Sequence, residues 1–298
     1  MVTMSNQDPF FPPASGQYPP PPPSYPVTSD IPPESPYHYS PAPSRRNNTG
    51  VAGGIVALLA GAFAYGKYAL LILFKVPFLL TVGTALLSTL AYASFGGWWF
   101  AIGLVLMIFV HEMGHVVEIR RQGMAATAPV FIPFMGAAIF QRSHAQSPIK
   151  QAQIGIAGPI AGTFGAAVAL LLYGTTHWSP LLGWAYWGFL INLFNMIPVG
   201  MLDGGWILAP VSKWIQVAGL AFLGILFFSG LVSPLVFIVV IVGVLMLVQR
   251  FRNPALDHYL TSGPASARYA LGAAWLGLVA FLAYGLFQTD AMLQTLVR

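Results

Sequence analysis

The 298-residue sequence contains no cysteine and very little charge. The absence of cysteine excludes disulfides and thiolate metal sites, so any metal must be bound by imidazole and carboxylate groups. Only 7% of the residues are charged, against roughly 25% in an ordinary soluble domain, and 56% are hydrophobic. Water is therefore not the main solvent of this chain, and a soluble globular domain is excluded.

The formal charge of +5 does not indicate a protein that binds nucleic acid. The Lys and Arg residues are scattered between apolar runs and are not gathered on one soluble face. They cluster at Arg120 and Arg121, in the loop that follows, and at Arg250 and Arg252. By the positive-inside rule these loops are cytoplasmic, and the lipid bilayer is the expected partner.

Residues 1–48 differ from the rest of the chain. They carry 14 of the 25 prolines, including the string PPPPPSYP, and few aliphatic residues. Such a segment cannot bury a core, so we expect a disordered Pro-rich tail. Its polyproline II runs could also bind an aromatic-grooved domain of a cytoplasmic partner, although plain disorder is the simpler interpretation. The first apolar run begins only after Asn48, so no signal peptide is expected at the start.

Eight apolar runs follow, at about 51–74, 77–95, 97–118, 152–173, 181–198, 214–231, 232–249 and 269–287. Several approach the ~20 residues that a helix needs to cross ~30 Å of hydrocarbon. We therefore expect residues 49–298 to form an all-α polytopic membrane domain with seven or eight transmembrane helices. The count depends on residues 51–76, where Lys67 and Lys75 interrupt the hydrophobicity; in the seven-helix alternative this segment lies along the interface. The side of the membrane on which the tail lies depends on the same choice.

One segment between these runs is too short to cross the membrane. The string APVFIPFMGAAIF, residues 128–140, contains two prolines and several β-branched residues. The sequence predicts a re-entrant loop or a small β-hairpin there.

The string FVHEMGHVVEIRRQG, which begins at Phe109, contains the motif HExxH as His111, Glu112 and His115. Positions i and i+4 of a helix share one face, so both imidazoles can reach one ion while Glu112 projects beside them toward a water molecule. A buried carboxylate in a transmembrane helix is by default functional, because it costs about 2.5 to 3.5 kcal/mol on insertion scales. The alternative is a polar contact between helices or a proton relay.

A tetrahedral zinc ion needs a third protein ligand and one open position. Glu118 is the nearest acid, but it lies seven residues from His111, about 10.5 Å along a helix, and is better explained as a partner of Arg120 or Arg121. Asp203 is the other candidate, in the otherwise apolar string NLFNMIPVGMLDGGW, where Pro198 must break the helix. Broken helices at membrane depth are tolerated where they face protein or a watery cavity. The alternative role of Asp203 is a helix N-cap.

The strings HEMGH and NMIPVGMLDGG together resemble the site-2 protease family of intramembrane metalloproteases, whose signature is HExxH in one transmembrane helix and NxxPxxxxDG in a later one. Both motifs match without a gap. The resemblance also includes FIPFMGAAI and IAGPIAG and covers roughly residues 67 to 252. It leaves the Pro-rich tail and the last apolar run outside.

The resemblance implies that zinc is bound by His111, His115 and Asp203, that Glu112 activates water, and that Asn195 contacts the substrate or the developing oxyanion. From the residues alone, Asn195 is equally suited to bond the carbonyls that Pro198 leaves free, and Asn192 is a weaker candidate for the same duties. Gly158 and Gly162 form a small-xxx-small pair that predicts close helix packing.

The function expected from these motifs is hydrolysis of membrane-anchored protein substrates near the cytoplasmic side, in a bacterial plasma membrane. A three-helix catalytic core is expected from runs 97–118, 152–173 and 181–198, within about 97–210. A substrate helix must unwind before cleavage, and the extended segment 131–139 could pair with the unwound strand. The alternatives are a proteolytically silent homologue that acts as an adaptor and a transporter of ions or protons.

Overall fold

The computed structural model describes residues 53–61, 63–65, 77–143 and 145–297. The Pro-rich tail, residues 1–48, lies outside the described residues, as do Lys67 and Lys75. The described residues fall into two units that divide after residue 60. Residues 53–61 and 63–65 are helical.

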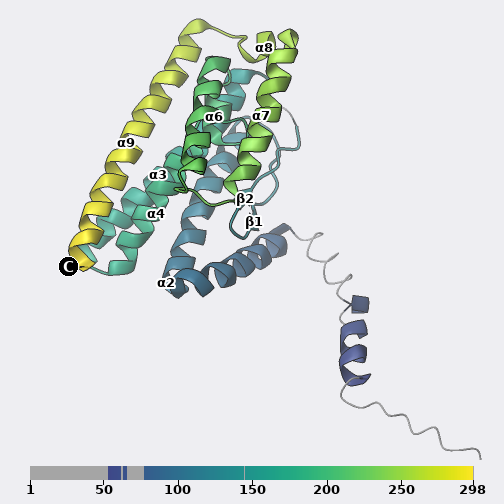
Figure 1. Cartoon of the computed structure of the whole chain (residues 1–298), viewed down its shortest axis with the longest axis vertical. Helices are drawn as coiled ribbons and strands as arrows, with labels where there is room; N and C mark the ends of the chain where they lie inside the picture. Colours follow the sequence, from purple (N-terminus) through teal and green to yellow (C-terminus); the bar gives the residue numbers. More distant parts are fainter. Residues whose placement is uncertain (1–52, 62, 66–76, 144, 298) are drawn as a thin grey trace, which may run out of the picture. The chain divides into compact units, whose positions relative to one another are not determined.

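The elements that follow are nearly all helices, in the order α2 (Pro77–Arg121), β1 (Val130–Ile132), β2 (Gly136–Ala138), α3 (Pro148–Thr176), α4 (Ser179–Asn195), α5 (Asp203–Leu208), α6 (Lys213–Phe228), α7 (Val236–Arg252), α8 (Pro254–Leu260) and α9 (Ala265–Val297). The predicted helical fold is therefore confirmed (Figure 1).

Three described helices are long and apolar enough to cross a membrane: Phe78–Arg121, Pro148–Thr176 and Ala265–Leu296. The pair α7 and α8, bent by 103° at its break, would make a fourth. The predicted count of seven or eight crossings is therefore not confirmed. Proline and loop residues end the other apolar runs early, so that α4 has 17 residues and α6 has 16, below the ~20 needed to span the hydrocarbon.

Helix α2 contains two of the predicted apolar runs. Gly97 interrupts it with φ of 77° and ψ of 171°, a backbone conformation that glycine adopts without steric strain. The two halves meet at an angle at this residue (Figure 1). The second half, from residue 98 to Arg121, carries the HExxH motif.

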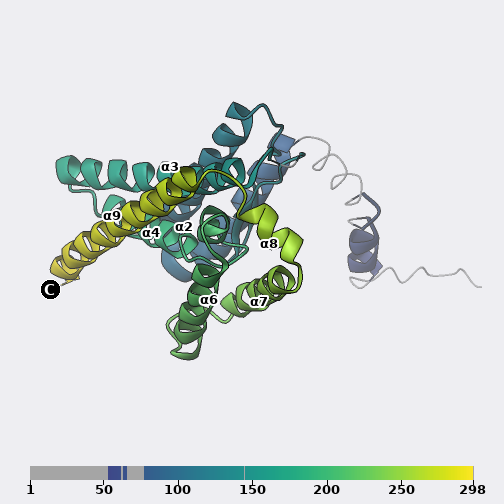
Figure 2. The same ribbon diagram turned by 90° about the horizontal axis from the view of Figure 1, so that it is seen from above.

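The second half of α2, together with α3 and α4, forms the predicted three-helix core. The buried side chains of Met107, Ala166 and Phe189 bring one residue from each of these helices into a single hydrophobic cluster. Helix α9 closes this cluster with Leu282, and Figure 2 shows α9 running along α3 and α4. The last apolar run, which lies outside the family resemblance, thus supports the helices that carry the motifs.

Strands β1 and β2 form an antiparallel hairpin, with Phe131 opposite Ala137. The prediction of a small hairpin is thereby confirmed. The hairpin is fixed to the first half of α2, because the Phe131 N–H donates to Thr84 Oγ1 at 3.1 Å and the Phe134 N–H donates to the Tyr92 hydroxyl at 3.0 Å. The outer edge of β1 is therefore occupied by helix α2.

Candidate metal centre

The motif residues of α2 lie where this helix packs against α3 and α4. His111 is 4% exposed and Glu112 is 8% exposed, so both polar side chains are buried. Asp203 is the first residue of α5, which begins after α4 has ended at Asn195 and the chain has passed Pro198. The break in the helix thus allows the chain to turn Asp203 back toward α2.

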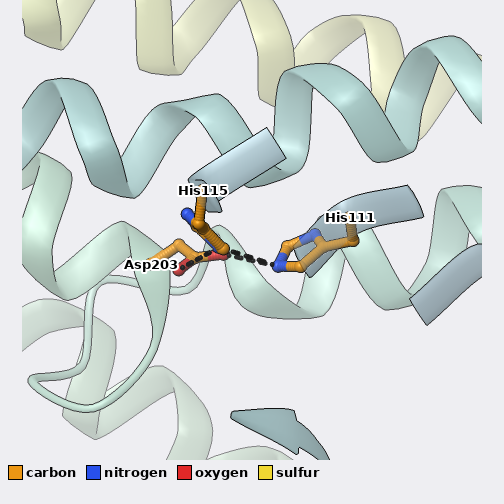
Figure 3. A group of neighbouring side chains, drawn as sticks. All are labelled: His111, His115 and Asp203. Carbon is orange, nitrogen blue, oxygen red and sulfur yellow. Dashed lines mark hydrogen bonds and ion pairs between the residues drawn. The ribbon is translucent and has the colours of Figure 1, made fainter. Parts of the chain in front are cut away.

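The side chains of His111, His115 and Asp203 point toward one another (Figure 3). His111 Nε2 lies 3.0 Å from Asp203 Oδ2, and His115 Nε2 lies 3.3 Å from Asp203 Oδ1. The two Nε2 atoms are 3.2 Å apart. Ligand atoms at about 2.0–2.1 Å from a tetrahedral zinc ion lie roughly 3.3 Å from each other, so this set has the spacing that zinc requires.

The hydrogen bonds of His111 determine which of its ring nitrogens faces the cluster as an acceptor. Its Nδ1 lies 2.8 Å from Asn192 Oδ1, and Asn192 Nδ2 donates to the Gly188 carbonyl at 2.7 Å. Because the second bond fixes the amide with its oxygen toward the ring, Nδ1 carries the proton and donates. The Nε2 atom of a neutral His111 therefore presents a lone pair.

His115 is oriented in the same way by the backbone of α3. Its Nδ1 lies 2.7 Å from the Ile154 carbonyl oxygen, which can only accept. A neutral His115 therefore also presents an Nε2 lone pair. With both imidazoles neutral, two lone pairs and a carboxylate converge on one point, which is the donor arrangement of a tetrahedral zinc site. The donor set fits zinc.

Glu112 is placed beside the candidate metal ligands. It follows His111 directly on α2, is buried, and interacts electrostatically with His111, His115 and Asp203. A carboxylate in this position can exchange protons with a water molecule next to the cluster.

The other predicted polar residues lie elsewhere. The Glu118 carboxylate accepts hydrogen bonds from Arg121 Nε at 2.7 Å and from Gln122 Nε2 at 2.9 Å, so it has the interfacial role that its spacing predicts. Asn195 is half-buried at the end of α4, and its side chain makes no hydrogen bond within the described parts of the chain. Its contact with the substrate stays a prediction.

The glycine pair of α3 packs against the centre itself. A Cβ atom added to Gly158 would overlap the His115 ring, and one added to Gly162 would overlap the Asn192 amide. The predicted close packing is therefore found, and its partners are a candidate ligand and the residue that orients another. The spacing alone could not identify these partners.

The fold and the site define a helical protein with apolar helices long enough to cross a membrane and a candidate His-His-Asp metal centre. Residues 99–178 match the family model for peptidase family M50, the site-2 protease family. The similarity to the site-2 protease family that the motifs indicate is thus confirmed. Zinc is the metal that this family implies.

Two curated relatives are named as zinc metalloproteases. Rip3 of Mycobacterium tuberculosis is 31% identical over 114 residues, which cover 35% of this chain and 28% of the relative. The chloroplastic EGY2 of Oryza sativa is 27% identical over 236 residues, which cover 62% of this chain and 42% of the relative. The matched regions thus span less than half of the relatives' own lengths.

The sequence does not predict two contacts of the centre, for different reasons. Asn192 is expected only as a weaker candidate for the duties of Asn195, and its bond to His111 is a different role. The Ile154 carbonyl carries no signal in the sequence, because every residue has a backbone carbonyl. Only the docking of α3 against α2 selects it.

Proposed function

We propose that this chain is an intramembrane zinc metalloprotease that hydrolyses peptide bonds of membrane-anchored proteins. The observation that carries the proposal is the convergence of His111, His115 and Asp203, with Glu112 beside them, inside a packed core of membrane helices. We assign the two histidines and Asp203 as the zinc ligands and Glu112 as the general acid and base.

Zinc, when bound, polarises the scissile carbonyl and favours ionisation of water. The chain's own residues do the rest. Asn192 and the Ile154 carbonyl hold both imidazoles with Nε2 toward the cluster. Glu112 takes a proton from the attacking water and returns it to the leaving amine. The surrounding helices exclude bulk water from these charges, which strengthens every electrostatic interaction among them.

The site lies toward the cytoplasmic end of α2. His115 is five residues, about 7.5 Å along the helix axis, from Arg120. Arg120 and Arg121 end this helix, and Lys150 lies at the start of α3 beside them. The positive-inside rule assigns this end to the cytoplasm, so cleavage is expected near that face. A bacterial plasma membrane is the proposed location.

The hairpin supports the proposal that substrate binds as an extended strand. The outer edge of β1 is occupied by Thr84, whereas Ala137 stands opposite Phe131 in the ladder. Two residues that stand opposite each other in an antiparallel pair both point their N–H and C=O groups either toward the partner strand or away from it. Because the Phe131 N–H points away from β2, the backbone groups of Ala137 point away from β1. An unwound substrate could pair with this edge, where no water is available to satisfy its backbone.

The test is a Glu112→Gln variant compared with the wild-type protein in detergent or vesicles. A protease retains stoichiometric zinc in both proteins, loses cleavage in the variant by several orders of magnitude, and traps intact substrates that mass spectrometry identifies. Dialysis of the wild-type protein against a chelator should abolish cleavage, and added zinc should restore it.

Other outcomes would identify the alternatives. Bound proteins that leave the wild-type protein uncut would indicate an adaptor. Ion or proton flux without proteolysis would indicate a transporter. Purified wild-type protein without stoichiometric zinc would overturn the proposed function.

A further inference from the structure

Arg250, near the C-terminal end of α7, is a buried cation with three hydrogen-bond partners. It is only 2% exposed. Its Nε donates to Asp257 Oδ1 at 2.7 Å, its Nη1 to Gln216 Oε1 at 2.8 Å, and its Nη2 to the Ala209 carbonyl at 2.9 Å. Burial of a guanidinium is costly unless it is paired and bonded, so a residue held in this way has a specific structural task.

The neighbouring Arg252 shows that an arginine at the end of α7 need not be buried to mark the cytoplasmic side of the membrane. Arg252 is the last residue of α7 and is exposed. Its side chain makes no hydrogen bond or ion pair with the rest of the described chain. An exposed arginine is sufficient for the positive-inside rule. The burial of Arg250 thus needs another explanation.

The contacts of Arg250 converge on α5, the six-residue helix that begins with Asp203. Ala209 is the C-cap of this helix and receives the Nη2 bond directly. Gln216, which accepts the Nη1 bond, donates through its own Nε2 to the Gly205 carbonyl at 3.0 Å. Two carbonyls of the segment that starts at Asp203 are therefore bonded to one network from α6 and α7.

Such support matters because α5 is too short to be stable alone. Isolated helices below ~12–15 residues are only marginally stable, because the free-energy cost of forming the first turn is offset by few hydrogen bonds. Here α5 also follows a broken segment. Ile207 and Leu208 anchor α5 in the hydrophobic core, and the bonds at its carbonyl end add a second, polar anchor that helps to direct the Asp203 carboxylate.

One carboxylate, that of Asp257, pairs with both cations of the network. Asp257 on α8 accepts from Arg250 through Oδ1 and from Lys213 through Oδ2, the latter at 2.8 Å. The network therefore links α6, α7 and α8 to α5 without contributing an atom to the metal centre.

We propose that Arg250 is a positioning residue for Asp203, which acts through Gln216 and the Ala209 carbonyl. The inference rests on the proposed function, because it takes Asp203 as a zinc ligand. Loss of the network lets α5 rotate and leaves the two imidazoles in place. Zinc then dissociates more easily, and kcat falls while KM changes little, because Arg250 does not touch substrate.

The experiment measures zinc affinity by chelator competition, kcat and KM on a membrane-anchored substrate, and thermal unfolding in detergent. Arg250→Met removes all three bonds, whereas Arg250→Lys keeps the charge and can restore at most part of them. Gln216→Glu keeps an acceptor for Arg250, removes the donor to Gly205 and adds a negative charge beside Arg250. Arg252→Met is the matched control.

We expect zinc affinity to fall about 10-fold or more in Arg250→Met, within the 10- to 100-fold range seen when groups that orient metal ligands are removed. The zinc affinities of Arg250→Lys and Gln216→Glu should lie between those of Arg250→Met and the wild-type protein. Arg252→Met should have the wild-type affinity. If Arg250→Met does not fold, the zinc affinity and kcat of Gln216→Glu test the inference. Wild-type zinc affinity and kcat in the folded Gln216→Glu and Arg250 variants would overturn the inference. A wild-type protein without zinc would instead overturn the proposed function.

Discussion

His111 Nδ1 lies 2.8 Å from the side-chain oxygen of Asn192, a residue with no exposed surface. Asn192 is fixed in turn by its bond to the Gly188 carbonyl, one turn earlier on α4. This chain of two bonds connects α4 to the imidazole on α2. It makes Asn192 the residue that sets the orientation of a candidate zinc ligand.

Replacing Asn192 should weaken zinc binding. Asn192→Leu has a similar volume but no acceptor for Nδ1–H, so His111 loses its fixed orientation. We expect zinc affinity to fall 10- to 100-fold, measured by chelator competition. Asn192→Asp keeps an acceptor oxygen and should retain most of the affinity. Equal affinity in both variants would contradict a role in orienting His111.

Asn195 should behave differently, because its side chain makes no hydrogen bond to a candidate ligand in the described part of the chain. If its amide stabilises the oxyanion, Asn195→Leu lowers kcat by about 10²- to 10³-fold and leaves zinc affinity unchanged. Steady-state kinetics and zinc content together check this. A variant with normal kcat would show that Asn195 serves only the backbone near Pro198.

Gly158→Ala should displace His115, because the new methyl group overlaps the imidazole. We expect at least a 10-fold loss of zinc affinity and a matching loss of cleavage. Gly174→Ala, on the same helix α3 but with open space around the added carbon, is the control and should equal the wild-type protein. Zinc binding unaffected by Gly158→Ala would mean that the α2 and α3 helices are not packed this closely.

Ala137→Pro tests whether substrate pairs with the edge of β2. Proline removes the outward N–H, and a lost main-chain hydrogen bond of about 1 kcal/mol corresponds to a rise in KM of roughly fivefold. Ala137→Val keeps the N–H and is the control. Zinc content should stay constant in both. Should Ala137→Pro cleave with normal KM, another surface holds the substrate.

Much of the site could be predicted because it depends on local periodicity. The i and i+4 spacing of His111 and His115 places both rings on one helix face in any fold that keeps the helix. The carboxylate of Asp203 stands out because its surroundings are apolar and Pro198 must end the helix before it. The hairpin at residues 130–138 follows likewise from a run that is too short and too broken to span.

The number of membrane crossings could not be predicted in the same way. Hydropathy marks apolar runs, but it does not determine where a helix ends inside such a run. The described helices α4 and α6 are shorter than the runs that predict them, and α2 joins two runs across Gly97. Where a helix ends depends on its caps, its bends and its neighbours as well as on composition.

The sequence by itself determined the class of protein, the absence of thiolate chemistry, and the shared helix face of His111 and His115, because composition and helical periodicity act over a few residues. The family resemblance implied Asp203 as their partner, and the fold brings it to them. The tertiary structure alone decided that Asn192 orients His111, that Ile154 offers its carbonyl to His115, and that Arg250 bonds to the segment bearing Asp203. These contacts join residues 39 to 81 positions apart. Such pairings arise from the docking of whole helices, which no local pattern encodes.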